Sequence, residues 1–184
     1  MRVLVANDIH GISLEVSDLL RALQVDQMLS PWDEGACPIP DEQAAVAVFL
    51  QNGGIQAYVK RIAETAAGEP VVMIGFSVGA TSVWHYLATQ ECHPDSKAIL
   101  FYGSRIRDAL DLSPRCQTSL IFAEHEASFD PSSLMSRVDH PLIKCELVHG
   151  AAHGFMNPRH ARYDAALAQK QISAIRQMLL LPAS

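Results

Sequence analysis

Short apolar runs rich in β-branched residues alternate along this chain with stretches of helical periodicity. Each run is only a few residues long and is bounded by polar residues, Gly or Pro, a pattern that favours buried strands over helices. Six strands are predicted in this way, at Val3–Ala6, Val25–Leu29, Val71–Ile74, Ala98–Tyr102, Ser119–Phe122 and Ile143–Val148.

The intervening stretches predict helices. One apolar stripe consists of Leu14, Leu19, Leu20 and Leu23, and a second of Ile55, Tyr58, Val59, Ile62 and Ala66, closed by Gly68. Further helices are expected near Asp41, over Ser77–Thr89 and from about Pro158 to Leu181, where Pro158 suits a first helical turn. Such alternation predicts an α/β fold, a three-layer sandwich with a mainly parallel six-stranded sheet and helices on both faces. With no repeat or linker along its 184 residues, the chain is expected to form a single domain over 1–184.

Charge and composition narrow the expected partners. The formal net charge is −6 and no run of Lys or Arg occurs, which argues against nucleic acid and acidic membranes as partners. No apolar stretch reaches the roughly 18 residues of a membrane span, and the N-terminus lacks a signal-peptide layout. The four cysteines show no CxxC spacing and are expected to be reduced thiols. A cytoplasmic location is therefore expected.

The pentapeptide Gly75-Phe76-Ser77-Val78-Gly79 is the main candidate for chemistry. It follows a predicted buried strand and precedes a predicted helix, as a nucleophile elbow does, and its glycines avoid side-chain clashes in the tight turn. An ordinary serine in a glycine-rich turn is the alternative. A serine nucleophile needs a base and a group that orients the base. In α/β folds that carry such an elbow, these partners follow along the chain in the order serine, acid, histidine.

His153 is the predicted base, because it lies in a loop between the last strand and the last helix, where the order of elements requires a histidine. Its neutral form can accept the serine proton. His149 is the weaker candidate, expected at the end of the strand. The two histidines are four residues apart, but the glycine and the loop between them argue against a metal site.

Three carboxylates are candidates for the acid. Glu126 is preferred because it follows the strand end at Phe122 by four residues, with Asp130 second and Glu124 third. Asp130 precedes Pro131 and suits a helix N-cap instead. The alternative for each of these three residues is an ordinary solvated charge in a loop, with no catalytic role.

The chain resembles the dienelactone hydrolase family in four segments. They are Leu4–Gly11, which includes Asn7-Asp8-Ile9-His10, the elbow Gly75–Gly79, Ala98–Gly103, which ends in Tyr-Gly, and Ala152–Phe155, which holds the histidine. The resemblance implies a minimal α/β-hydrolase fold, a Ser77–Glu126–His153 triad, and an oxyanion hole from the N–H groups of Ile9 and Val78. It also makes Asp8 an active-site carboxylate, with helix capping or binding of loop amides as the alternative.

Three features depart from the family's pattern. Ser77 stands where the best-known members carry cysteine, Glu126 where the acid is usually aspartate, and little chain remains between the second and third strands. The positions that bind an anionic lactone in the family are missing between the second and third strands, so dienelactone is a poor candidate substrate. Asp8 and His10 remain substrate-binding candidates, with Arg105 and Arg159 as arginines for a substrate carboxylate or as ordinary surface residues.

The predicted activity is hydrolysis of a small-molecule ester through an acyl-enzyme intermediate, with no cofactor and no metal. A thioesterase with the same triad is one alternative. A non-catalytic binding protein on a hydrolase scaffold is another, since a fold does not guarantee a function. A flavodoxin-like nucleotide binder fits the order of elements but lacks a phosphate loop. A homodimer is left open.

Overall fold

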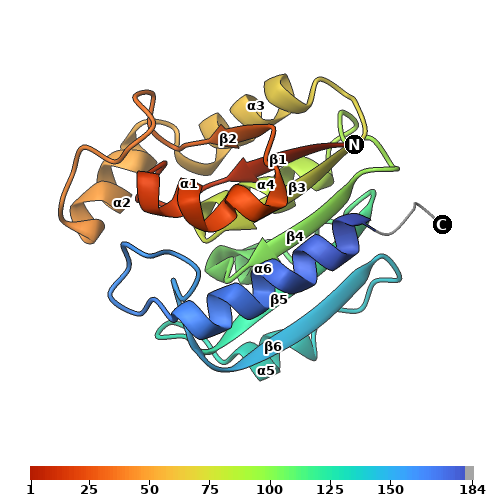
Figure 1. Cartoon of the computed structure of the whole chain (residues 1–184). Coiled ribbons are helices and arrows are strands. Elements are labelled where there is room, and N and C mark those ends of the chain that lie inside the picture. The colour runs from red at the N-terminus through yellow and green to blue at the C-terminus, as the bar shows by residue number, and fades with distance from the viewer. Residues whose placement is uncertain (181–184) are drawn as a thin grey trace.

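The six predicted strands form one parallel sheet in the computed structural model, which describes residues 1–180 (Figure 1). Their order across the sheet is β2-β1-β3-β4-β5-β6, and each neighbouring pair is parallel. The strands are β1 (Arg2–Ala6), β2 (Gln27–Leu29), β3 (Val71–Phe76), β4 (Lys97–Phe101), β5 (Gln117–His125) and β6 (Ile143–Ala152). The predicted α/β class with a mainly parallel six-stranded sheet is confirmed.

Helices cover both faces of this sheet. One layer contains α1 (Leu14–Leu20), the 3-10 helix η1 (Arg21–Leu23) and α6 (Ala165–Leu180), and Figure 1 shows α1 and α6 in front of the strands. The other layer contains α2 (Glu42–Gln51), α3 (Gly54–Ala66), α4 (Val78–Leu87), η2 (Ser104–Asp108) and α5 (Pro131–Met135). A hydrophobic core lies on each face of the sheet, and alternate side chains of β3 point into the two cores. Val72 and Ile74 pack towards α6, while Val71 and Met73 pack towards α4. This is the layering that the apolar runs predict.

The order of strands places one crevice of the sheet at the ends of β1 and β3. The chain runs from β1 outward to β2, then returns past β1 to β3 and continues in the opposite direction. In open α/β sheets, ligands bind beyond the carboxyl ends of the strands at such a reversal. Asp8 after β1 and Ser77 after β3 both line a small cleft at this point.

The first helix differs from the predicted stripe at its start. Leu14 is 83% exposed, whereas Val16 is buried together with Leu19 and Leu20. The reason is the N-cap: the Ser13 hydroxyl accepts a hydrogen bond from the Val16 N–H, so the helix begins at Leu14 and turns that side chain outward.

The last helix begins at Ala165, so the prediction of a start near Pro158 is wrong. Residues 158–164 form turns, in which Asn157 Oδ1 accepts from the Arg159 N–H and His160 Nδ1 from the Arg162 N–H. These side-chain acceptors compete with helical hydrogen bonding. The predicted end at Leu181 lies outside the described residues.

The strands β5 and β6 extend further than their apolar runs predict. β5 continues to His125 and β6 to Ala152, with an irregular register between Ala123 and His125. Glu126 therefore follows its strand directly instead of lying four residues past its end, and His149 lies within β6 instead of at its end. Polar residues in these extensions hide the strand pattern, because both lie at the edge of the core.

Within residues 1–180, no helix is long and apolar enough to cross a membrane.

Candidate active site

Ser77 lies at the sharp turn between β3 and α4, with φ 50° and ψ −113°. This backbone conformation is strained for a residue with a side chain. The turn is tight on both sides: a Cβ atom at Gly75 would lie 2.6 Å from the Ala80 Cα, and one at Gly79 would lie 2.2 Å from the Ala6 carbonyl oxygen. The predicted role of the two glycines, avoiding clashes in the elbow, is confirmed.

Three side chains form a continuous hydrogen-bonded chain at this turn. The Ser77 Oγ lies 3.0 Å from His153 Nε2, and His153 Nδ1 lies 2.9 and 3.1 Å from the two carboxylate oxygens of Glu126. The Glu126 side chain is only 2% exposed and that of His153 28%. The buried carboxylate favours the tautomer with its proton on Nδ1, which leaves Nε2 free to accept the serine proton.

The two long strands of the sheet position the histidine and the acid. His153 directly follows β6, and its N–H donates to the carbonyl oxygen of His125, the last residue of β5, at 3.2 Å. Glu126 is the next residue after His125, so this bond fixes the distance between the two loops. The buried ring of Tyr102, just past β4, packs against the imidazole with centroids 5.0 Å apart.

The other candidates for these positions have different contacts. Asp130 caps α5, where its carboxylate accepts from the Ser132 N–H, as its place before Pro131 predicts. Glu124 accepts from the Gly150 N–H at 2.7 Å and lies 2.9 Å from Nδ1 of His149, whose side chain is 79% exposed. The pKa of Glu124 is lowered chiefly by the Gly150 hydrogen bond. This outer pair lies apart from the bonded chain that includes Ser77.

Asp8 is buried beside Ser77. Its carboxylate accepts hydrogen bonds from the His10 N–H at 2.9 Å and from Nδ2 of Asn157 at 2.7 Å. Burial raises the pKa of Asp8, and the Asn157 hydrogen bond offsets part of that effect. Asp8 thus binds a loop amide, whereas Ser13 caps the first helix. Sequence reasoning missed Asn157, which is 149 positions away.

The two candidate oxyanion donors come from the turns after β1 and β3. Val78 begins α4, where backbone N–H groups have no partner within the helix. Ile9 lines the small cleft with Ser77, and its carbonyl oxygen accepts from the Trp32 indole N–H at 2.6 Å, which fixes the turn after β1.

A larger pocket of about 720 Å³ opens beside His153 and Glu126. Besides Glu126, the acidic residues of its lining are Glu42, Glu124 and Asp130, and Arg162 is the Arg or Lys residue that lines it within the described residues. Neither candidate arginine lines this pocket or the small cleft in the part of the chain described. Arg105 is 60% exposed and pairs with Asp108 at 3.5 Å, and Arg159 is exposed.

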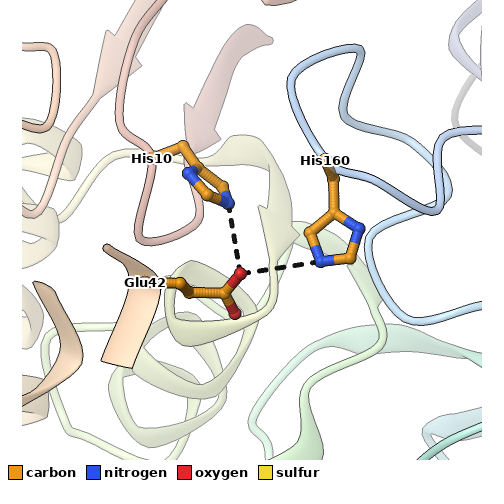
Figure 2. Close-up of side chains that lie close together, drawn as sticks. All are labelled: His10, Glu42 and His160. Carbon is orange, nitrogen blue, oxygen red and sulfur yellow. Dashed lines mark ion pairs between the residues drawn. The ribbon is translucent and has the colours of Figure 1, made fainter. Parts of the chain in front are cut away.

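His10 lies at the rim of the small cleft with two residues that sequence reasoning did not identify, Glu42 and His160. In Figure 2 the two imidazoles flank the Glu42 carboxylate, and dashed lines run from both to the same oxygen. Nε2 of His10 is 3.7 Å and Nε2 of His160 3.8 Å from that oxygen. Burial lowers the pKa of His160. No motif relates these three positions.

Comparisons with known proteins identify the family of this chain. The sequence profile of the dienelactone hydrolase family matches residues 42–180, a span that contains Ser77, Glu126 and His153 but not the turn after β1. An uncharacterised protein of Bacillus subtilis (strain 168), YczH, is 28% identical over 184 residues, covering 95% of this chain and 90% of its own.

Two solved structures share the fold. A candidate dienelactone hydrolase from Klebsiella pneumoniae superposes with a TM-score of 0.70 at 17% identity, covering 94% of this chain and 83% of its own. A candidate hydrolase of the α/β superfamily from Xanthomonas campestris superposes with a TM-score of 0.63 at 16% identity, covering 97% of both chains. Since the family profile matches most of its length, this chain belongs to the dienelactone hydrolase family and is a hydrolase that acts on ester bonds.

Proposed function

We propose that this protein is a serine hydrolase that cleaves an ester-type bond of a small molecule through an acyl-enzyme intermediate. The observation that carries the proposal is the bonded chain from Ser77 Oγ through His153 to the buried carboxylate of Glu126. This is the arrangement in which a serine hydroxyl is activated by a base and the base is oriented by an acid.

In the proposed reaction, Ser77 Oγ attacks the ester carbonyl carbon while His153 Nε2 takes the hydroxyl proton. His153 then gives this proton to the leaving alcohol as the carbon–oxygen bond of the ester breaks. Water then attacks the acyl-serine while the same nitrogen takes its proton. The nitrogen gives this proton to Ser77 Oγ as the bond between Oγ and the acyl carbon breaks, which releases the acid and restores Ser77. Throughout, the Glu126 carboxylate accepts the hydrogen bond from Nδ1–H of His153 and stabilises the imidazolium.

The proposed oxyanion hole consists of the N–H groups of Ile9 and Val78. The N–H of Val78 stands at the start of α4, so the helix dipole adds to its effect on a developing negative charge. In enzymes where one such donor has been removed, the loss is about 3 kcal/mol of transition-state stabilisation.

The charges around the larger pocket favour a substrate without a carboxylate. Glu42, Glu124 and Asp130 face this space against Arg162, and Arg105 and Arg159 lie elsewhere. An anionic acyl group would meet more like charge than opposite charge there. We therefore expect neutral small esters to react faster than esters with a free carboxylate in the acyl group, at equal leaving group.

Intact-protein mass spectrometry tests the proposal. The wild-type protein, mixed briefly with p-nitrophenyl esters of increasing acyl length, should gain one acyl group and turn over. Ser77→Ala should gain none and show no labelling by a fluorophosphonate probe, whereas His149→Ala should behave as the wild type. Acylation of Ser77→Ala at the wild-type rate, or an unlabelled wild type, would refute the proposal; the second result would favour a binding protein.

Thioesterase activity is the other proposal for the same site, since the triad chemistry is common to oxyesters and thioesters. Matched acyl oxyester and acyl thioester substrates separate the two. A kcat/KM that is higher for the thioester across several acyl groups would identify a thioesterase.

A further inference from the structure

Three potential metal ligands converge at the entrance of the Ser77 cleft, from segments far apart in the sequence. His10 follows β1, Glu42 is the first residue of α2, and His160 lies in the turns before α6. One ligand atom from each lies within 4.8 Å of the other two. The two imidazole rings are nearly perpendicular, with centroids 6.0 Å apart, and both present Nε2 to Glu42 (Figure 2).

The side chains of this cluster form no hydrogen bonds with one another. Nε2 of His10 is buried and has no hydrogen-bond partner among the described residues. Its separation of 3.7 Å from Glu42, like the 3.8 Å of His160, is too long for a hydrogen bond. A buried nitrogen without a partner costs free energy, so the three groups point to a ligand between them.

We propose that His10, Glu42 and His160 form a binding site for a divalent transition-metal ion of the zinc type. Two imidazole nitrogens and one carboxylate oxygen are a ligand set that zinc uses in sites with an open fourth position. A tetrahedral ion with bonds of about 2.0–2.1 Å separates its ligands by roughly 3.4 Å. The separations of 3.7 and 3.8 Å from Glu42 are slightly longer than this, and small side-chain rotations close the difference.

Binding requires one local rearrangement. Nδ1 of His160 accepts from the Arg162 N–H at 3.1 Å, so the neutral ring carries its proton on Nε2. Coordination through Nε2 moves that proton to Nδ1 and breaks the bond to Arg162. Both residues belong to the turns before α6, outside the sheet.

The three residues line the small cleft that also contains Ser77. The Glu42 side chain is 51% exposed, which gives an ion access from solvent. An ion at this place carries positive charge next to the proposed nucleophile, so it should alter the rate of ester hydrolysis. The binding site itself does not depend on Ser77 being the nucleophile.

Titration of the chelator-treated, reduced protein with Co²⁺, followed by competition with Zn²⁺, tests the site. One Co²⁺ per chain should bind with a visible spectrum that lacks a thiolate charge-transfer band. Glu42→Gln should weaken binding at least tenfold in a metal-free protein that still unfolds cooperatively, and His160→Ala should weaken binding to the same extent. His149→Ala is the matched control, because it removes a histidine 2.9 Å from a carboxylate outside the cluster, and it should bind as the wild type.

Wild-type affinity in Glu42→Gln, a thiolate band, or no stoichiometric binding would overturn the metal site. Ser77→Ala separates this proposal from the proposed function, since it should be inactive and still bind one Co²⁺. If Ser77→Ala keeps its esterase activity while Glu42→Gln loses the metal, the proposed function fails and the metal site stands.

Discussion

The carboxylate of Glu126 lies 2.9 Å from Nδ1 of His153, although the two residues are 27 positions apart and follow different strands. The contact depends on the extra length of β5 and β6, whose ends are joined by the bond from the His153 N–H to the His125 carbonyl. A glutamate directly after β5 reaches the histidine from there, since its side chain is one methylene longer than that of aspartate.

Variants of Glu126 and Asp130 should differ in kind: the first should lose activity and the second stability. Glu126→Gln keeps the shape of the side chain but cannot stabilise the imidazolium, so kcat should fall at least a hundredfold. Asp130→Ala should leave kcat within about twofold and lower the free energy of unfolding by about 0.5–2 kcal/mol, because it removes the cap of α5. Steady-state kinetics and urea unfolding of both variants provide the check. An essential Asp130 and a dispensable Glu126 would make Asp130 the acid.

The strained conformation of Ser77 predicts a difference between two inactive variants. Ser77→Ala keeps a Cβ atom at φ 50° and ψ −113°, whereas Ser77→Gly removes it. The strain at such a residue is about 1–3 kcal/mol, and glycine loses about 0.5–1 kcal/mol through its greater freedom in the unfolded chain. Ser77→Gly should therefore be the more stable variant, by about 1 kcal/mol, or roughly 2–4 °C in Tm.

Differential scanning calorimetry of the two serine variants measures this difference directly. Equal Tm values, or a lower Tm for Ser77→Gly, would show that a Cβ atom at position 77 causes no net backbone strain.

The two histidines near the end of β6 should differ sharply in function. His153→Ala removes the group that is bonded to both Ser77 and Glu126, so kcat/KM for p-nitrophenyl acetate should fall at least a hundredfold. His149→Ala removes an exposed ring that pairs only with Glu124 among these groups, and activity should change less than twofold. Loss of activity in His149→Ala with full activity in His153→Ala would move the proposed base to His149.

The parts of this protein that sequence patterns predict are those with local signals. The buried strand Val71–Phe76 and the flanking glycines mark Ser77, because the elbow is built from consecutive residues. Pro131 marks Asp130 as a cap in the same way. The predicted ends of the elements were less accurate. β6 continues through polar residues to Ala152, and α6 begins only at Ala165, after turns in which side chains accept hydrogen bonds from the backbone.

Contacts between distant segments have no such signal. Asn157 reaches Asp8 across 149 positions, and the same turns bring His160 to Glu42. Each of these residues is an ordinary polar side chain in its own stretch of sequence. Only the folding of the turns before α6 over the ends of β1 and β3 makes them neighbours, so a sequence pattern could identify His10 and Asp8 but not their partners.

The buried carboxylate of Asp8 predicts a specific dependence of stability on pH. Its pKa in the folded protein is raised above 3.8, mainly because burial disfavours the charged form. A raised pKa means that the folded state binds the proton more tightly than the unfolded state. The resulting contribution to stability is present below pH 3.8 and is lost as the pH rises through the pKa of folded Asp8.

Asp8→Asn removes this titration and leaves a group of nearly the same shape. The variant also changes the hydrogen bonds from Asn157 and the His10 N–H, which adds an offset to the difference in free energy of unfolding. The free energy of unfolding of the wild type, minus that of Asp8→Asn, should therefore fall as the pH rises above 3.8, with a slope of at most about 1.4 kcal/mol per pH unit. Urea unfolding of both proteins at half-unit steps from pH 4 to 8 measures the difference, with the exposed Asp139→Asn as a control for loss of one surface carboxylate. A difference that stays constant or grows with pH would mean that the Asn157 and His10 hydrogen bonds outweigh the burial of Asp8, and that the carboxylate is held ionised beside Ser77.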